Sequence, residues 1–324
     1  MIASILRFLS VLTGVCAVFA FGTQCTAQGF PSMPIRMVIP YPPSGAPDAM
    51  ARVIGPRLGE SAGWKIVVDN RPGGSGIIAA GIVTKAPADG HTLFVADTSH
   101  LAVNPSLFPN LPYDPIKDFA PVTNAVTVTL FLTVNATLPV QTVGQLIEYA
   151  KSRPGIPYAS SGNGSSAHIG IELFKLLAGI NMTHVPYKGV AFTLPAVISG
   201  DVSVVFVGGP AVLPHVKAGK VRVLAASRRT ASMPDIPSIA EAGVPGYEHR
   251  ADIGIVAPAG TPKDVIATLN REIVKVLAMP DIAQRLIAMG LEPVGSSPEQ
   301  YEEITRAEIQ KYKKLFKEIS VRVD

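Results

Sequence analysis

Short apolar runs alternate with amphipathic helical stretches along most of this chain, and that alternation constrains its fold more than any other feature. The runs 36–40, 65–69 and 92–96 predict strands. The stretches 48–58 and 76–85 between them have helical periodicity. Because repeated strand–helix–strand units favour a parallel sheet covered by helices on both faces, the sequence predicts an α/β fold.

Two long extended runs, 125–134 and 252–257, interrupt this alternation and bracket a second series of strands and helices. The simplest arrangement has two α/β lobes joined by two strands that cross a hinge. Such a hinge places a ligand cleft between the carboxyl ends of both sheets, where open α/β folds bind their ligands. The predicted lobe 1 is residues 28–125 plus 250–324, and lobe 2 is residues 126–249.

The amino terminus is typical of a secretory signal peptide. Met1 to Arg7 carries one positive charge and no acid, Phe8 to Gly22 is almost wholly apolar or small, and small residues end the segment at Ala27. We therefore expect residues 1–27 to be a cleaved signal peptide and the mature protein to be periplasmic. A retained amino-terminal anchor is the alternative.

Removal of this segment would leave a mature chain without cysteine, because both cysteines, Cys16 and Cys25, lie within it. Disulfides, thiolate metal sites and cysteine nucleophiles would then be excluded. The formal charge of +4 would fall to +3 with the loss of Arg7. Basic residues are scattered except in the last helix, so we expect no nucleic-acid partner.

The loop 41–48 (YPPSGAPD) is a candidate anion site, because it follows the first strand and ends where a helix begins. Free backbone N–H groups and the helix dipole at such a start favour a negative charge. We expect Asp48 to cap this helix. A purely structural turn is the alternative interpretation.

The loop 158–168 (YASSGNGSSAH) holds the equivalent position in lobe 2, with its helix opening near Ser165 or Ser166. Its serine hydroxyls can donate hydrogen bonds, and its glycines let a ligand approach the backbone. A loop capped by serine for structural reasons is the alternative.

Catalytic interpretations of the same loop are less well supported. A hydrolase would use Ser161 or Ser165 with His168, yet the nucleophile-elbow pattern is absent and no nearby acid orients the histidine. The chain also has no Walker A lysine, dinucleotide fingerprint or close histidine pair. We expect no catalytic residue, metal or cofactor. In the loop 70–76, Arg71 is expected to form a bracing salt bridge.

Several segments resemble the extracytoplasmic solute receptors of the tripartite tricarboxylate transporter type, the Bug receptors. The matching pieces cover essentially the whole mature chain in the expected order. They include PYPPSGAPDAMAR (40–52), VVDNRPGGSG (67–76), APADGHTL (86–93), YASSGNGSSAH (158–168), THVPYKG (183–189) and PDIPSIAEAGVPGYE (234–248).

This resemblance implies a type II periplasmic binding protein that is not an enzyme. It would capture a small carboxylate between its lobes and deliver it to a membrane permease of a tripartite tricarboxylate transporter, or serve a sensor, and we expect a monomer. The ligand-binding residues carried over are Tyr41, Ser44, Gly45, Ala46, Asp48, Thr98, Ser99, Ser161, Gly162, Asn163, Gly164, Ser165, Ser166, His168 and Tyr187.

The sequence departs from the family pattern at two places. Where the family usually has two glycines, this chain has Ser44-Gly45, and the serine side chain either adds a hydroxyl contact or narrows the pocket. After the strand 202–207, where many members carry a polar residue, this chain has Val207-Gly208. The second departure favours an aromatic or otherwise apolar-bodied acid.

Overall fold

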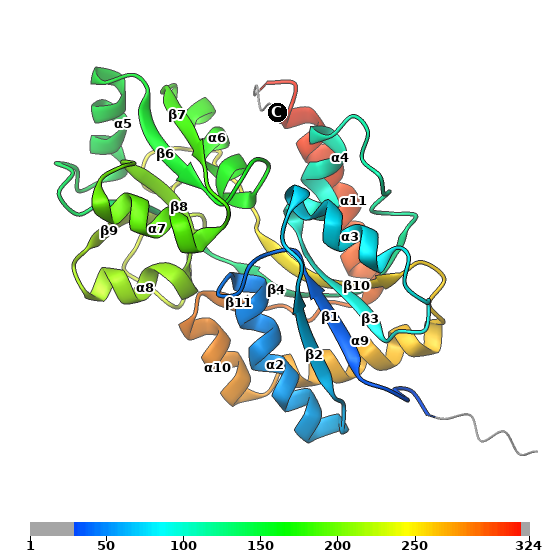
Figure 1. Cartoon of the computed structure of the whole chain (residues 1–324). Helices are drawn as coiled ribbons and strands as arrows, with labels where there is room; N and C mark the ends of the chain where they lie inside the picture. The colour runs from blue at the N-terminus through cyan, green and yellow to red at the C-terminus, as the bar shows by residue number, and fades with distance from the viewer. Residues whose placement is uncertain (1–28, 319–324) are drawn as a thin grey trace, which may run out of the picture. The chain divides into compact units, whose positions relative to one another are not determined.

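Two mixed β-sheets organise the chain in the computed structural model, which describes residues 29–318 (Figure 1). All of the elements named below belong to one compact unit that starts at Met33. The first sheet has the strand order β11-β4-β10-β3-β1-β2. Its strands are β1 (Ile35–Ile39), β2 (Ile66–Asn70), β3 (Thr92–Asp97), β4 (Phe119–Val128), β10 (Asp252–Pro258) and β11 (Leu291–Pro293).

The parallel part of the first sheet is the part that the alternating pattern predicts. Strand β1 pairs in parallel with both β2 and β3, whereas β10 runs antiparallel to β3 and β4. Helix α9 buries Ile266, Leu269 and Ile273 along one stripe and packs against β4 and α2. The helices of this half are α2 (Ala46–Ala62), α3 (Ile77–Val83), α4 (Asn104–Leu107), α9 (Lys263–Leu277), α10 (Pro280–Ala288) and α11 (Pro298–Leu315), with a short 3-10 helix η1 (Gly74–Gly76) and a π-helical segment η2 (Ser99–Val103).

The second sheet has the order β7-β6-β8-β5-β9. Strand β6 is parallel to β7 and β8, and β5 is antiparallel to β8 and β9. Its strands are β5 (Leu130–Asn135), β6 (Ile156–Ser160), β7 (Met182–Pro186), β8 (Val204–Gly208) and β9 (Val221–Ala226). Its helices are α5 (Val143–Ser152), α6 (Ser166–Ala178), α7 (Val190–Ser199) and α8 (Gly209–Lys217).

The first extended run crosses between the sheets as expected. Strand β4 ends at Val128 in the first sheet, and β5 begins at Leu130 in the second, so the chain changes sheets at Thr129. This crossing and the two sheets confirm the two-lobed α/β fold. The exact lobe boundaries, 28–125 plus 250–324 and 126–249, stay a prediction.

The second crossing differs from the prediction of a strand. Strand β10 lies wholly in the first sheet, and the chain returns from β9 through residues 227–251. Within that described segment the only β-pairing is an isolated bridge between Ala226 and Ser238. Prolines 234, 237 and 245 explain this, because proline cannot donate to a strand ladder.

The predicted Asp48 cap of α2 is wrong, and α6 has the serine cap that was the structural alternative for its loop. Gly45 is the N-cap of α2, and Asp48 lies in the first turn, where it accepts from the Ser44 amide (3.1 Å) and from Arg52 Nε (2.9 Å). The hydroxyl of Ser165 caps α6 by accepting from the His168 amide at 3.3 Å. The helix starts that border the candidate site therefore have different caps.

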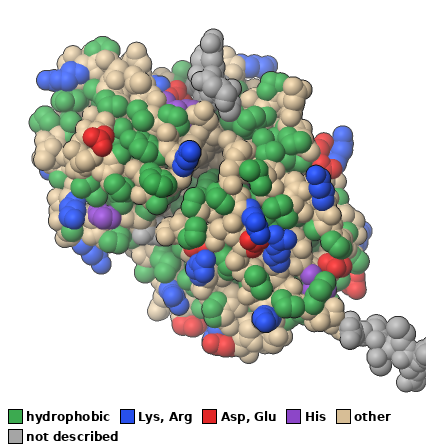
Figure 2. All heavy atoms as spheres, viewed as in Figure 1, with side chains coloured by type: hydrophobic (Ala, Val, Ile, Leu, Met, Phe, Trp, Pro, Cys, Tyr) green, Lys and Arg blue, Asp and Glu red, His purple; other side chains and the backbone are tan. Residues whose placement is uncertain are grey.

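The predicted signal peptide, residues 1–27, lies outside the described residues. Within residues 29–318, no helix has the length and apolarity that a membrane crossing requires. Basic side chains are scattered over the face shown in Figure 2, without a continuous stripe. The described part also contains no cluster of metal-ligating side chains.

Candidate functional site

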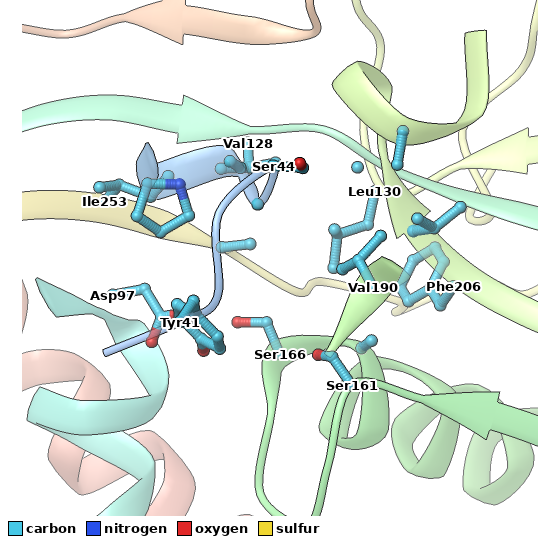
Figure 3. Close-up of a pocket in the computed structure, with 18 residues that line it drawn as sticks. Tyr41, Ser44, Asp97, Val128, Leu130, Ser161, Ser166, Val190, Phe206 and Ile253 are labelled. Atoms are coloured by element: carbon cyan, nitrogen blue, oxygen red, sulfur yellow. The ribbon is translucent and has the colours of Figure 1, made fainter. Parts of the chain in front are cut away.

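A cavity between the two sheets is lined by residues from both (Figure 3). Its volume, measured as the space open to the centre of a water molecule, is about 80 Å³. A single bound water needs roughly 10–15 Å³ by that measure, so the cavity can hold a small organic molecule. We call it the interlobe cavity. Its lining comprises Tyr41, Ser44, Gly45, Ala46, Pro47, Asp97, Val128, Leu130, Ser161, Ser166, Ala167, Val190, Phe206, Val207, Gly208, Ala211, Ala251 and Ile253.

Four helices begin at this cavity. Cap or first-turn residues of α2, α6, α7 and α8 are all part of its lining. The caps of α2, α7 and α8 are Gly45, Gly189 and Gly208, and none of them forms a side-chain cap bond. Their first-turn N–H groups thus have no side-chain acceptor at the cap. Several helix dipoles with free donors favour an anion without any cationic side chain.

Hydroxyl groups supply further donors on the same side of the cavity. Figure 3 shows Ser161 and Ser166 beside each other, with Tyr41 nearby. The Ser166 hydroxyl is buried and has no hydrogen-bond partner among the described residues. Ser44 has a φ of 81°, which is unusual for a residue other than glycine. A buried hydroxyl without a partner is costly, so a ligand at Ser166 would remove that cost.

Asp97 is the one acidic residue in the cavity lining. Its carboxylate accepts from Tyr41 Oη (2.6 Å) and the Ser99 amide (2.9 Å), and it lies 2.7 Å from His100 Nδ1. Burial alone would raise the pKa of Asp97, but the His100 imidazole and these hydrogen bonds lower it below its usual value. Asp97 is therefore an ionised carboxylate whose acceptor capacity is largely used.

The opposite side of the cavity is apolar. Leu130, Val190 and Phe206 lie together there in Figure 3. Leu130 and Phe206 are almost fully buried. Val207 and Gly208, which the sequence singled out as the less polar cleft edge, also belong to this wall.

A stacked histidine pair, the buried His168 and the half-buried His184, holds the loop 158–168 in place. The rings of His168 and His184 are stacked with centroids 3.7 Å apart. His168 Nδ1 accepts from the Gly164 amide (3.1 Å), and His184 Nε2 lies 2.6 Å from Ser160 Oγ. Burial lowers the pKa of His168 to about 4 and that of His184 to about 3, so both rings are neutral at pH 7.

This arrangement does not favour the hydrolase alternative. The serine that contacts a histidine ring is Ser160, which is fully buried and does not line the interlobe cavity. His168 uses Nδ1 to fix the loop and likewise does not line the interlobe cavity. The pair instead positions the backbone of the loop that forms one wall of the site.

A second, more polar cavity of about 490 Å³ is lined in part by residues 161–165 of the same loop. Tyr41 and Ser161 line both cavities. Asn104 Oδ1 and Ser99 Oγ are buried beside it and have no partner among the described residues. The exposed Lys188 is also part of its lining.

The fifteen predicted ligand-binding residues thus separate into three groups. Tyr41, Ser44, Gly45, Ala46, Ser161 and Ser166 line the interlobe cavity, whereas Ser99, Gly162, Asn163, Gly164, Ser165 and Tyr187 line the second cavity. Three others lie behind these surfaces. Asp48 fixes the turn at Ser44, Thr98 Oγ1 accepts from the Asp252 amide (3.0 Å), and His168 fixes the loop.

Sequence reasoning missed Asp97 and most of the apolar wall. Asp97 is the last residue of β3, and its position at the carboxyl end of a parallel strand was the available signal. Arg71, in contrast, forms the expected salt bridge, with Nε 2.9 Å from Asp69 Oδ1.

Comparison with known proteins decides the family. Residues 50–321 match the tripartite tricarboxylate transporter family receptor. The chain belongs to this family. Among similar structures is that of the periplasmic binding protein BugD, which is 27% identical, superposes with a TM-score of 0.84, and is matched over 90% of this chain and 99% of its own.

Two further similar structures contain ligands. The Rhodopseudomonas palustris protein Rpa4515, solved with adipate, is 38% identical with a TM-score of 0.85 over 89% of this chain and 98% of its own. MatC from the same organism, solved with malate, is 29% identical with a TM-score of 0.82 over 88% and 99%. The chain is thus a family receptor with the fold of these binding proteins.

Proposed function

We propose that this receptor binds a small carboxylate in the interlobe cavity. The observation that carries the proposal is the convergence of four helix starts, three without a side-chain cap, on a cavity that also contains the unpartnered Ser166 hydroxyl. Family membership and the carboxylates bound by Rpa4515 and MatC support it. No bond is made or broken, and recognition is the whole of its chemistry.

The location and partners follow from the family and from the amino-terminal pattern. Residues 1–27 would direct export and be removed, which leaves the receptor in the periplasm. Residues 28–125 with 250–324, and 126–249, would act as lobes that close on the ligand and exclude water. The closed receptor would then deliver its carboxylate to the permease subunits of a tripartite tricarboxylate transporter.

Two neighbouring serines provide a matched test. Ser166→Ala removes the unpartnered hydroxyl and should leave the free protein as stable as before, or more stable. It should weaken carboxylate binding by about 10- to 100-fold, because a hydrogen bond to a charged group contributes roughly 1.5–3 kcal/mol. Ser165→Ala removes the α6 cap and should instead cost about 1 kcal/mol of stability.

A panel of carboxylic acids is first screened for those that raise the melting temperature of the receptor. The affinity of each variant for these acids is then measured by calorimetric titration, and its stability by urea unfolding. Unchanged affinity of Ser166→Ala for every such acid would contradict the proposed position of the ligand. Absence of saturable binding by any acid of the panel would contradict the function itself.

A further inference from the structure

We propose that Ser75 is a positioning residue for ligand capture, because its hydroxyl ties the loop 158–168 of one lobe to the other lobe in the closed, ligand-bound state. The inference rests on the proposed function, since a bond between lobes raises ligand affinity only where capture closes them. Ser75 lies in the loop 70–76, for which the sequence predicted only the salt bridge of Arg71.

The hydroxyl of Ser75 forms a hydrogen bond between the two halves of the molecule. Ser75 follows β2 of the first sheet, and its Oγ donates to the carbonyl oxygen of Asn163 at 3.2 Å. Asn163 lies between β6 of the second sheet and α6, in the loop that also contributes Ser161 and Ser166 to the interlobe cavity. Ser75 itself is not part of that lining. Its bond therefore acts on the wall of the ligand site and not on the ligand.

The loop around Ser75 is braced from behind. The carbonyl oxygen of Ser75 accepts from Nδ2 of the almost fully buried Asn104 at 3.0 Å. The next residue, Gly76, lies so close to His100 that a Cβ atom there would overlap the imidazole ring. His100 Nδ1 is itself 2.7 Å from the carboxylate of Asp97, which lines the interlobe cavity. The position of the Ser75 hydroxyl is thus fixed by groups that also hold Asp97.

The backbone of Ser75 adopts a conformation that is unfavourable for serine. Its φ is 50° and its ψ is 38°, in the left-handed region that residues other than glycine rarely adopt. The neighbouring Gly73, Gly74 and Gly76 also have positive φ values, which glycine adopts without strain. Serine at this position differs from glycine in its strain and in its hydroxyl, and the hydroxyl donates to Asn163. Strain retained together with a bond between lobes points to a functional role.

Packing beside the bond keeps the two lobes in register. Gly164 follows Asn163, and a Cβ atom at Gly164 would overlap Cδ2 of Leu107 in α4. Ile169 in α6 is fully buried in an apolar cluster with Leu107 and with Tyr312 of α11. Ser75 adds a directional hydrogen bond to this apolar interface. The closed state gains that bond with little further ordering, because both partners are already held by their neighbours.

The test compares Ser75→Ala and Ser75→Gly with the wild-type mature receptor by calorimetric titration, stopped-flow dissociation and urea unfolding without ligand. The probe is the acid among adipate, malate, succinate and benzoate that binds the wild type most tightly. Both variants lose the hydroxyl, so we expect affinity to fall by about three- to tenfold, mainly through faster dissociation. Ser75→Gly also relieves the backbone strain, so it should unfold at a higher urea concentration than the wild type although it binds more weakly.

Ser152→Ala is the matched control, because the Ser152 hydroxyl donates to the carbonyl oxygen of Tyr149 within a single helix, α5 (2.9 Å). It should leave affinity and dissociation unchanged. A bond that only stabilised the fold would give Ser75→Ala a lower urea midpoint with wild-type affinity and dissociation. That result would overturn the inference and leave the proposed function intact. Failure of all four acids to bind the wild type would overturn both.

Discussion

Gly170 in α6 connects helix packing to the shape of the apolar wall. A Cβ atom at this position would lie 2.5 and 2.7 Å from two ring carbons of Phe206 and 3.1 Å from His249 Cδ2. Optimal carbon–carbon contacts are about 3.5–4.0 Å, so Gly170→Ala requires Phe206 to move by about 1 Å. Phe206 is 2% exposed and lines the cavity, so it has little room except toward the ligand.

The magnitude follows from two opposing contributions. Overpacking of this kind costs typically about 1–3 kcal/mol, and alanine in a helix regains about 0.5–1 kcal/mol relative to glycine. We therefore expect Gly170→Ala to lower the free energy of unfolding by about 1–2 kcal/mol. Carboxylate affinity should also fall by about tenfold, because the displaced ring narrows the cavity.

Gly81 in α3 is the matched control, because no atom lies within 4 Å of the Cβ that alanine would add. Gly81→Ala should raise stability by about 0.5–1 kcal/mol and leave affinity unchanged. Urea unfolding and calorimetric titration of both variants measure these effects. If Gly170→Ala proved as stable as Gly81→Ala and bound ligand normally, the proposed role of Phe206 would be refuted.

Two further predictions concern stability. Burial is the main cause that lowers the pKa of His168 to about 4, and of His184 and His249 to about 3. Below the unfolded-state histidine pKa of about 6.5, the unfolded chain therefore binds more protons than the folded chain. The free energy of unfolding should consequently fall from about pH 7 to about pH 5, by up to ~1.4 kcal/mol per histidine and pH unit. Urea titrations at both pH values measure this, and a flat profile would contradict it. Ser44→Gly should raise the unfolding free energy by about 1 kcal/mol, because glycine adopts the φ of 81° without strain; thermal melting that shows no gain would argue against strain at Ser44.

The sequence predicted features with local signals well. Hydrophobic periodicity located most strands and helices of both sheets, whereas the short elements α4 and β11 were not predicted. The run 125–134 could be assigned to a crossing because no helix interrupts it. These features depend on neighbours along the chain.

Features that depend on tertiary contacts were harder to predict. Asp97 lies at the site because β3 ends beside the loop that precedes α2. Its negative charge is stabilised by Tyr41, which is distant in sequence, and by His100, which is near in sequence but not obviously paired with it. The return segment 227–251 resembles no regular element, so the strand that follows it was mistaken for the crossing itself. The division of the loop 158–168 between two cavities requires both lobes to be in place.

The central claim is that the ligand carboxylate lies at the helix starts of the interlobe cavity. A crystal structure of the receptor with the acid that binds most tightly tests it directly. We predict the carboxylate at Ser161 and Ser166, with the body of the acid directed toward Phe206. A carboxylate found beside Asn104 and Lys188 in the second cavity would contradict the account.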